Sequence, residues 1–199
     1  MQEHLARASL SVAIIAITGL AQHAIASESN DAASAASIER GATLVGVGGC
    51  MDCHTPFRMG PNGPEKDLAR GLSGHPQEMA LPPPPVLDAA WNWAGSASTT
   101  AFVGPWGISY ASNLSPDRET GIGTWHVDTF IRAMRSGKHL GVGRPIMPPM
   151  PWQALGKLPD EDLRAMFAYL MAQPPVRNQV PDYAPPPAVA GDGKAKGSG

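Results

Sequence analysis

Residues 50–54 read Cys50-Met51-Asp52-Cys53-His54, and they carry the most specific signal in the chain. Cys-x-x-Cys-His is the pattern through which c-type haem is attached to a protein. On a helical turn, residues i and i+3 face the same way, so both thiols can form thioethers with the vinyl groups on one porphyrin edge. The imidazole of His54 can then bind the iron as its proximal ligand. One such motif predicts one covalent haem c, held by Cys50, Cys53 and His54.

Three other uses of the two cysteines compete with haem attachment. A thiol–disulfide redox pair is typical of a βαβ context, which the sequence pattern does not show. A zinc site needs further ligands in a cluster, whereas the downstream histidines, His75, His126 and His139, are scattered. A structural disulfide leaves His54 without a role. We favour haem, and the export predicted below agrees with it because haem attachment occurs outside the cytoplasm.

The composition limits the class of protein. The chain has 199 residues, 43% of them hydrophobic and 16% charged, which fits one domain with a buried core. A net charge of -2 excludes a strongly basic nucleic-acid binder. Two cysteines exclude a disulfide-dense scaffold. The 22 glycines and 21 prolines indicate that loops make up much of the fold.

The N-terminal segment has the pattern of a signal peptide. Arg7 supplies a positive charge, residues 10–20 form an apolar run, and residues 24–26 (Ala-Ile-Ala) offer a small-x-small cleavage site. We expect a signal peptide over 1–26 and a flexible leader over 27–36, with an uncleaved N-terminal anchor as the alternative. Export places the mature chain in the periplasm or at the outer face of the bacterial cytoplasmic membrane. Peripheral association with that membrane is compatible with this location.

Three segments are predicted to be helical. The first begins near Ser37 and continues into the haem motif. The second covers Val127–Ser136, with Thr124 as its N-cap and Gly137 as its C-terminal stop. The third follows the acids at 160–162, shows the i, i+3, i+4, i+7 apolar pattern over 163–170, and ends before Pro174. The end of the chain, 177–199, has the composition of a low-complexity tail.

The stretch over about 55–105 shows no clear periodicity. It contains a turn signal at 61–64 (Pro-Asn-Gly-Pro) and a run of four prolines at 82–85. Its tryptophans can bury area, which argues against plain disorder. We interpret it as an ordered, Pro/Gly/Trp-rich insertion packed on the main domain. No strand pattern is convincing, so the predicted fold class is all-α.

The sixth iron ligand is expected from a proline-rich loop. Residues 145–152 read Pro-Ile-Met-Pro-Pro-Met-Pro-Trp and offer Met147 and Met150. A thioether is a soft ligand suited to haem iron. Flanking prolines restrain the loop without adding backbone donors. We favour Met150 over Met147, and the three downstream histidines remain as further candidates.

Several motifs resemble one bacterial group of cytochrome c domains, which occurs in single-haem proteins and in the cytochrome subunits of membrane-bound alcohol and gluconate dehydrogenases. The resemblance covers roughly 38–176, interrupted by the insertion. It implies a cytochrome c domain over 37–176, with an all-α cytochrome c fold around one haem and Met150 as the distal ligand. It also implies that the last helix crosses the first near Gly41. The matching stretches are 50–54, Asn113–Asp117, Thr120–Trp125 and Pro148–Pro151.

These features predict a one-electron carrier, which passes electrons between a dehydrogenase or respiratory complex and an acceptor. No acid–base or nucleophile constellation is visible, so we expect an electron-transfer protein that is not an enzyme. Two alternatives stay open. One is a peroxidase-like or small-molecule-reducing haem enzyme with a displaceable sixth ligand. The other is a fixed electron-transfer subunit of a larger complex.

Overall fold

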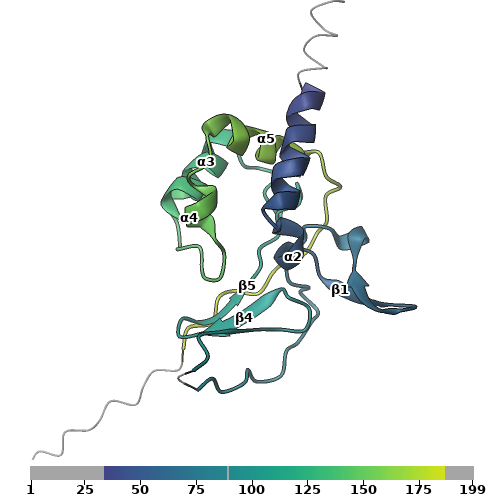
Figure 1. Ribbon diagram of the computed structural model, residues 1–199, viewed down its shortest axis with the longest axis vertical. Helices are drawn as coiled ribbons and strands as arrows, with labels where there is room; N and C mark the ends of the chain where they lie inside the picture. Colours follow the sequence, from purple (N-terminus) through teal and green to yellow (C-terminus); the bar gives the residue numbers. More distant parts are fainter. Residues whose placement is uncertain (1–33, 89, 187–199) are drawn as a thin grey trace, which may run out of the picture.

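The computed structural model describes residues 34–88 and 90–186 (Figure 1). The predicted signal peptide over 1–26, most of the predicted leader and the last part of the predicted tail lie outside the described residues. No helix within the described ranges has the length and apolar character that crossing a membrane requires.

Helices and two small sheets alternate along the chain. A helix over 34–47, called here the N-terminal helix, leads through a turn into α2. Strands β1 and β2 form an antiparallel hairpin, and β3, β4 and β5 form an antiparallel sheet in sequence order. The bounds are α2 Cys50–His54, β1 Phe57–Gly60, β2 Gly63–Lys66, η1 Leu68–Arg70, β3 Ala94–Gly95, β4 Ala101–Gly104, β5 Gly107–Tyr110, α3 Val127–Ser136, η2 His139–Gly141, α4 Trp152–Leu155 and α5 Asp160–Met171.

The prediction of an all-α fold is wrong, because five strands lie between residues 57 and 110. They fall in or directly after the predicted insertion. Each has only two to four residues, and their glycines and Pro64 are poor strand formers, so no alternating pattern stands out in the sequence. The turn signal at 61–64 does mark the β1–β2 hairpin, in which Gly60 pairs with Gly63.

The N-terminal helix crosses α5 at Gly41, as the resemblance predicted. A Cβ built on Gly41 would lie 2.0 Å from the carbonyl oxygen of Ala165 and 2.8 Å from the Cβ of Tyr169. Only glycine allows the two backbones to come this close. Next to the crossing, Arg40 forms a two-pronged ion pair with Asp162, at 2.9 and 3.2 Å.

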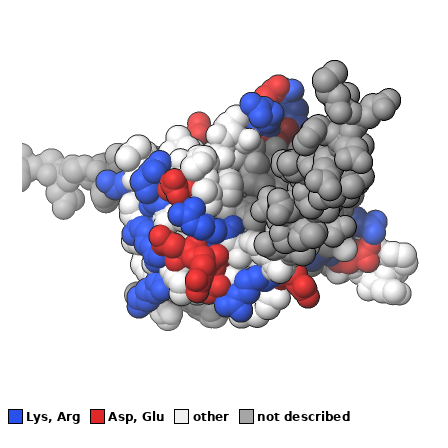
Figure 2. Space-filling view, turned by 90° about the horizontal axis from the view of Figure 1, so that it is seen from above, with Lys and Arg blue, Asp and Glu red and all other residues white. Residues whose placement is uncertain are grey.

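Further ion pairs connect the helices and loops at the surface. On the face shown in Figure 2, Lys and Arg side chains lie next to Asp and Glu side chains. Exposed pairs of this kind contribute about 0–1 kcal/mol each. The pairs between elements include Arg135–Asp160, Arg164–Asp128 and Arg177–Glu119.

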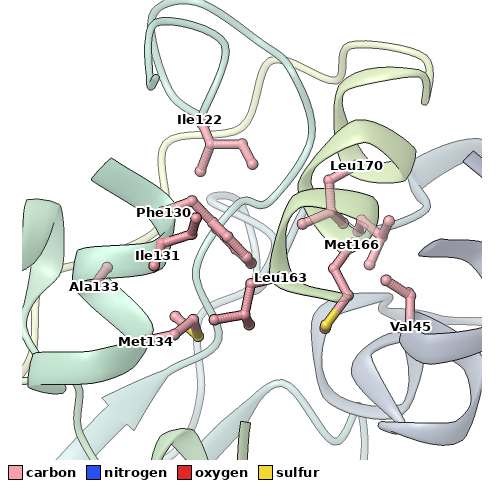
Figure 3. Close-up of a cluster of buried hydrophobic side chains, with 10 residues drawn as sticks. Val45, Ile122, Phe130, Ile131, Ala133, Met134, Leu163, Met166 and Leu170 are labelled. Carbon is pink, nitrogen blue, oxygen red and sulfur yellow. The ribbon is translucent and has the colours of Figure 1, made fainter. Parts of the chain in front are cut away.

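The core is a hydrophobic cluster between α3, α5 and the N-terminal helix (Figure 3). Phe130 of α3 meets Phe167 of α5 with ring centroids 5.6 Å apart. Leu72, from the predicted insertion, also belongs to the cluster and is 1% exposed. The insertion therefore forms part of the core. The buried members are Val45, Leu72, Ile122, Phe130, Ile131, Ala133, Met134, Leu163, Met166 and Leu170.

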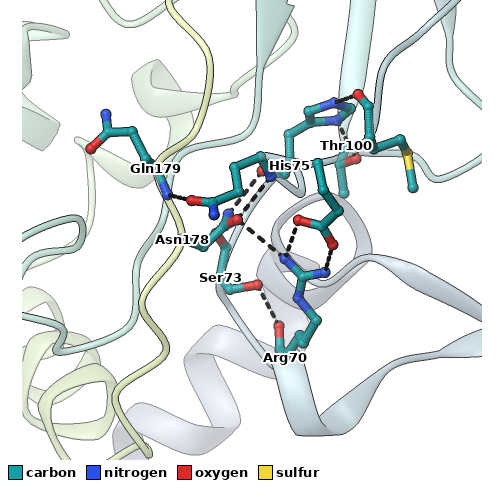
Figure 4. A network of polar contacts seen from close by, with 9 residues as sticks. Arg70, Ser73, His75, Thr100, Asn178 and Gln179 are labelled. Carbon is teal, nitrogen blue, oxygen red and sulfur yellow. Dashed lines mark hydrogen bonds and ion pairs between the residues drawn. The ribbon is translucent and has the colours of Figure 1, made fainter.

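After α5, residues 176–184 run back across the molecule and bind the insertion; we call them the strap. Asn178 is fully buried, and its amide nitrogen donates to the backbone oxygens of Ser73 (2.7 Å) and His75 (2.8 Å) (Figure 4). Its amide oxygen accepts from Arg70 at 3.1 Å. Ala184 pairs with Ile108 of β5. The strap thus joins the end of α5 to the insertion at Ser73 and His75 and to β5, which directly follows the insertion.

We expect Gly41→Ala to destabilise the fold by roughly 1–3 kcal/mol, because the added methyl group meets the backbone of α5. The matched control is Gly46→Ala in the same helix, where a Cβ meets no atom within 4 Å. That change should be neutral or stabilise by up to about 1 kcal/mol, since alanine is the better helix former. Denaturant unfolding of the two variants measures the difference. Equal effects would contradict the close crossing at Gly41.

Candidate functional site

The haem motif forms α2, a helix of five residues. It starts after Gly49, whose φ of +64° separates it from the N-terminal helix. Cys50 and Cys53 are partly buried and are not joined in a disulfide. Burial raises the pKa of both thiols, and the nearby Lys66 only partly opposes this for the pKa of Cys53. Redox cysteines need the opposite, a lowered pKa. The thiols thus do not resemble an activated redox pair.

His54 is held in the form that binds a metal. Its side chain is buried, and its Nδ1 lies 2.7 Å from the backbone oxygen of Ser112, to which it donates. Burial lowers the pKa of His54, which favours the neutral ring. With the proton on Nδ1, the lone pair of Nε2 is free for a metal. Ser112 follows β5, and no sequence pattern could have identified it because the contact uses a backbone carbonyl.

The insertion supports the end of α2. Lys66 of β2 donates to the backbone oxygens of Asp52 (2.6 Å) and Thr55 (3.2 Å). Thr99, in the turn before β4, donates to the same Asp52 oxygen at 2.6 Å. These bonds satisfy carbonyls that a helix end leaves without partners. Together with the bond from His54 to Ser112, these contacts hold the motif by residues up to 58 positions away in sequence.

The proline-rich loop over 145–151, called here the methionine loop, packs on the same hydrophobic cluster as Cys50. Cys50 and Met150 are both partly buried side chains that pack against this cluster. Met147 is also half-buried, but it is not among the described side chains that pack there. Just after Met150, α4 brings Leu155 close to Cys50. A Cβ built on Gly48 would lie 3.6 Å from the Cys50 sulfur and 3.8 Å from Leu155.

The three downstream histidines make other contacts. His75 is fully buried and uses both ring nitrogens, with Thr100 at 2.9 Å and the Met79 oxygen at 3.2 Å. His126 is exposed and caps α3 by accepting from the amide of Asp128. His139 packs edge-on against Trp125, with ring centroids 5.2 Å apart. The bonds of His75 leave it no nitrogen for a metal.

The donor set fits haem c. Two neutral thiols lie three residues apart on one helical turn, and the next residue presents a neutral imidazole whose Nε2 is free. A thioether lies on the same apolar cluster as the first thiol. Cys50 and Cys53 would hold the porphyrin covalently, and His54 and Met150 would supply one nitrogen and one sulfur ligand.

Comparison with known proteins points the same way, although no family model matches the chain. One of the subunits of the nicotinate dehydrogenase of Pseudomonas putida is 34% identical over 148 residues, which are 74% of this chain and 10% of that protein. The cytochrome c subunit of the quinone-dependent alcohol dehydrogenase of Gluconobacter oxydans is 29% identical over 157 residues, 77% of this chain and 26% of that protein.

The gluconate 2-dehydrogenase cytochrome c subunit of Pantoea cypripedii is 29% identical over 142 residues, 71% of this chain and 24% of that protein. The chain thus spans between a tenth and about a quarter of the length of these relatives. The resemblance predicted from the motifs is confirmed: this chain is a relative of the cytochrome c subunits of bacterial dehydrogenases.

Proposed function

We propose that this chain is a periplasmic, single-haem c-type cytochrome that carries one electron at a time between a dehydrogenase or respiratory complex and an acceptor. The observation that supports this most strongly is the state of the haem motif. Cys50 and Cys53 are free thiols on one turn, and His54 is fixed by its bond to Ser112 with Nε2 available. When bound there, haem c supplies a one-electron iron couple.

The chain's own residues would hold and tune that group. The bond from His54 Nδ1 to Ser112 fixes the ring orientation and increases the basicity of Nε2. His/Met ligation favours a raised reduction potential. The apolar side chains that pack on the cluster exclude water, which also affects the potential. They include Leu44, Ile146, Leu155 and Leu158.

A dehydrogenase is the proposed partner, since the relatives are subunits of dehydrogenases by name. The face seen in Figure 2 carries charges of both signs in close alternation. A partner that docks on the part of this face formed by the described residues would meet charges of both signs. Charges of one sign gathered in an extended patch would favour long-range steering, and mixed charges favour it less.

The relatives' names also favour a second candidate, a fixed subunit of a larger complex. Such complexes bury larger and more apolar interfaces than transient redox encounters. Purification from native membranes separates the two proposals. A free carrier elutes alone in size-exclusion chromatography, whereas a fixed subunit elutes with its dehydrogenase.

We expect the haem to be covalent. Acid–acetone extraction of the denatured protein should leave the colour on the polypeptide, and Cys50→Ser or Cys53→Ser should abolish or sharply reduce the yield of coloured protein. Asp52→Asn is the matched control, because Asp52 lies between the two cysteines and its side chain is exposed. Free haem in the organic phase from the wild type would contradict covalent attachment.

We expect Met150 to be the sixth ligand. The ferric protein should show a weak near-infrared sulfur-to-iron band, and Met150→Leu should remove it while nearly preserving side-chain volume. The potential should fall by roughly 0.1 V or more, within the range of about 0.8 V that axial ligands span. A redox-titrated absorption spectrum measures both effects.

Met147→Leu is the control for this ligand and should keep the band. Loss of the band in Met147→Leu alone would transfer the assignment to Met147. A wild-type protein without the band, with a high-spin iron, would instead indicate an open site, as a haem enzyme requires.

A further inference from the structure

The methionine loop has few backbone donors of its own. Residues 145, 148, 149 and 151 are prolines, which have no N–H group. At its start, the amide of Ile146 donates to the oxygen of Gly137 at 2.8 Å. Within the loop, the amide of Met150 donates to Met147 at 3.3 Å, a long and weak bond. Fixing the loop near Met150 therefore requires a donor from elsewhere in the chain.

Ser109 of β5 supplies that donor. Its hydroxyl donates to the backbone oxygen of Pro148 at 2.5 Å, two residues before Met150. Among the described residues, this is the hydrogen bond that reaches 147–150 from another part of the chain. Ser109 is 5% exposed, so water competes little for the bond.

The hydroxyl of Ser109 is itself oriented by its neighbours. The indole Nε1 of Trp106 donates to it at 3.2 Å, which turns the hydroxyl proton toward Pro148. Trp106 in turn is held from the strap, because the hydroxyl of Tyr183 donates to its backbone oxygen. A continuous chain of three hydrogen bonds thus connects the strap, the β3–β4–β5 sheet (called here the inserted sheet) and the methionine loop.

We infer that Ser109 is a positioning residue for the sixth ligand, and that through it the inserted sheet determines how often the Met150 sulfur leaves the iron. The inference rests on the proposed function, in which Met150 binds the iron. Losing the Ser109 bond removes the hydrogen bond that ties the Pro148 carbonyl to β5, which increases the population of the open loop.

Cyanide binding to the ferric holoprotein measures this population, because cyanide can occupy the sixth position only after the sulfur has left. We expect Ser109→Ala to bind cyanide roughly two- to tenfold faster than wild type, the factor that a typical intramolecular hydrogen bond provides. Ser109→Thr keeps the hydroxyl and should stay near the wild-type rate. Ser109→Val has the shape of threonine without the hydroxyl and should behave like Ser109→Ala.

Ser98→Ala is the control within the insertion. Ser98 is also a buried serine, but its hydroxyl bonds reach Ser96 and Thr100 and not the methionine loop. An equal acceleration in Ser98→Ala, or equal rates for the threonine and valine variants, would overturn the role of Ser109. A wild type with the near-infrared band and unchanged rates in all variants refutes only this inference. A wild type without the band refutes the methionine ligand itself, and this inference with it.

Discussion

The contact between Gly41 and Ala165 is the constraint on which the arrangement of the site depends. It fixes the N-terminal helix against α5 at a distance that only glycine allows. Because α2 follows the N-terminal helix after one turn, this crossing also fixes where Cys50 stands against the hydrophobic cluster. The helices thereby place the haem motif and the methionine loop on one shared core.

Residues of the strands, and of the segments next to them, hold the haem motif and the methionine loop by hydrogen bonds. Lys66 and Thr99 hold the end of α2, and the segment after β5 supplies the carbonyl that binds His54. Ser109 of β5 donates to Pro148 in the methionine loop. The haem motif and the methionine loop are therefore both hydrogen-bonded to the stretch over 66–112. The same stretch contributes Leu72 to the core. This stretch acts as an internal support as well as a surface.

Strong local patterns made the helices predictable. The predicted bounds of α3 and its stop at Gly137 are confirmed, because the apolar spacing is regular and the left-handed Gly137 ends the helix. The predicted N-cap, Thr124, is wrong: the side chain of His126 caps the helix instead. The strands escaped prediction because two to four residues are too few to show a period of two. Contacts such as His54–Ser112 and Asn178–Ser73 use backbone carbonyls, which every residue carries, so only the tertiary fold can select them.

The strap has a consequence for how the fold is completed. Asn178 bonds to Ser73 and His75 across separations of 105 and 103 residues, so these bonds form only when nearly the whole domain is in place. Pairings this remote in sequence are slow to form. A chain that ends before the strap would leave two interior carbonyls without their donor, at about 1–3 kcal/mol each. Because the strap binds last, a chain shortened before residue 176 would fold to a less stable state than one that contains the strap.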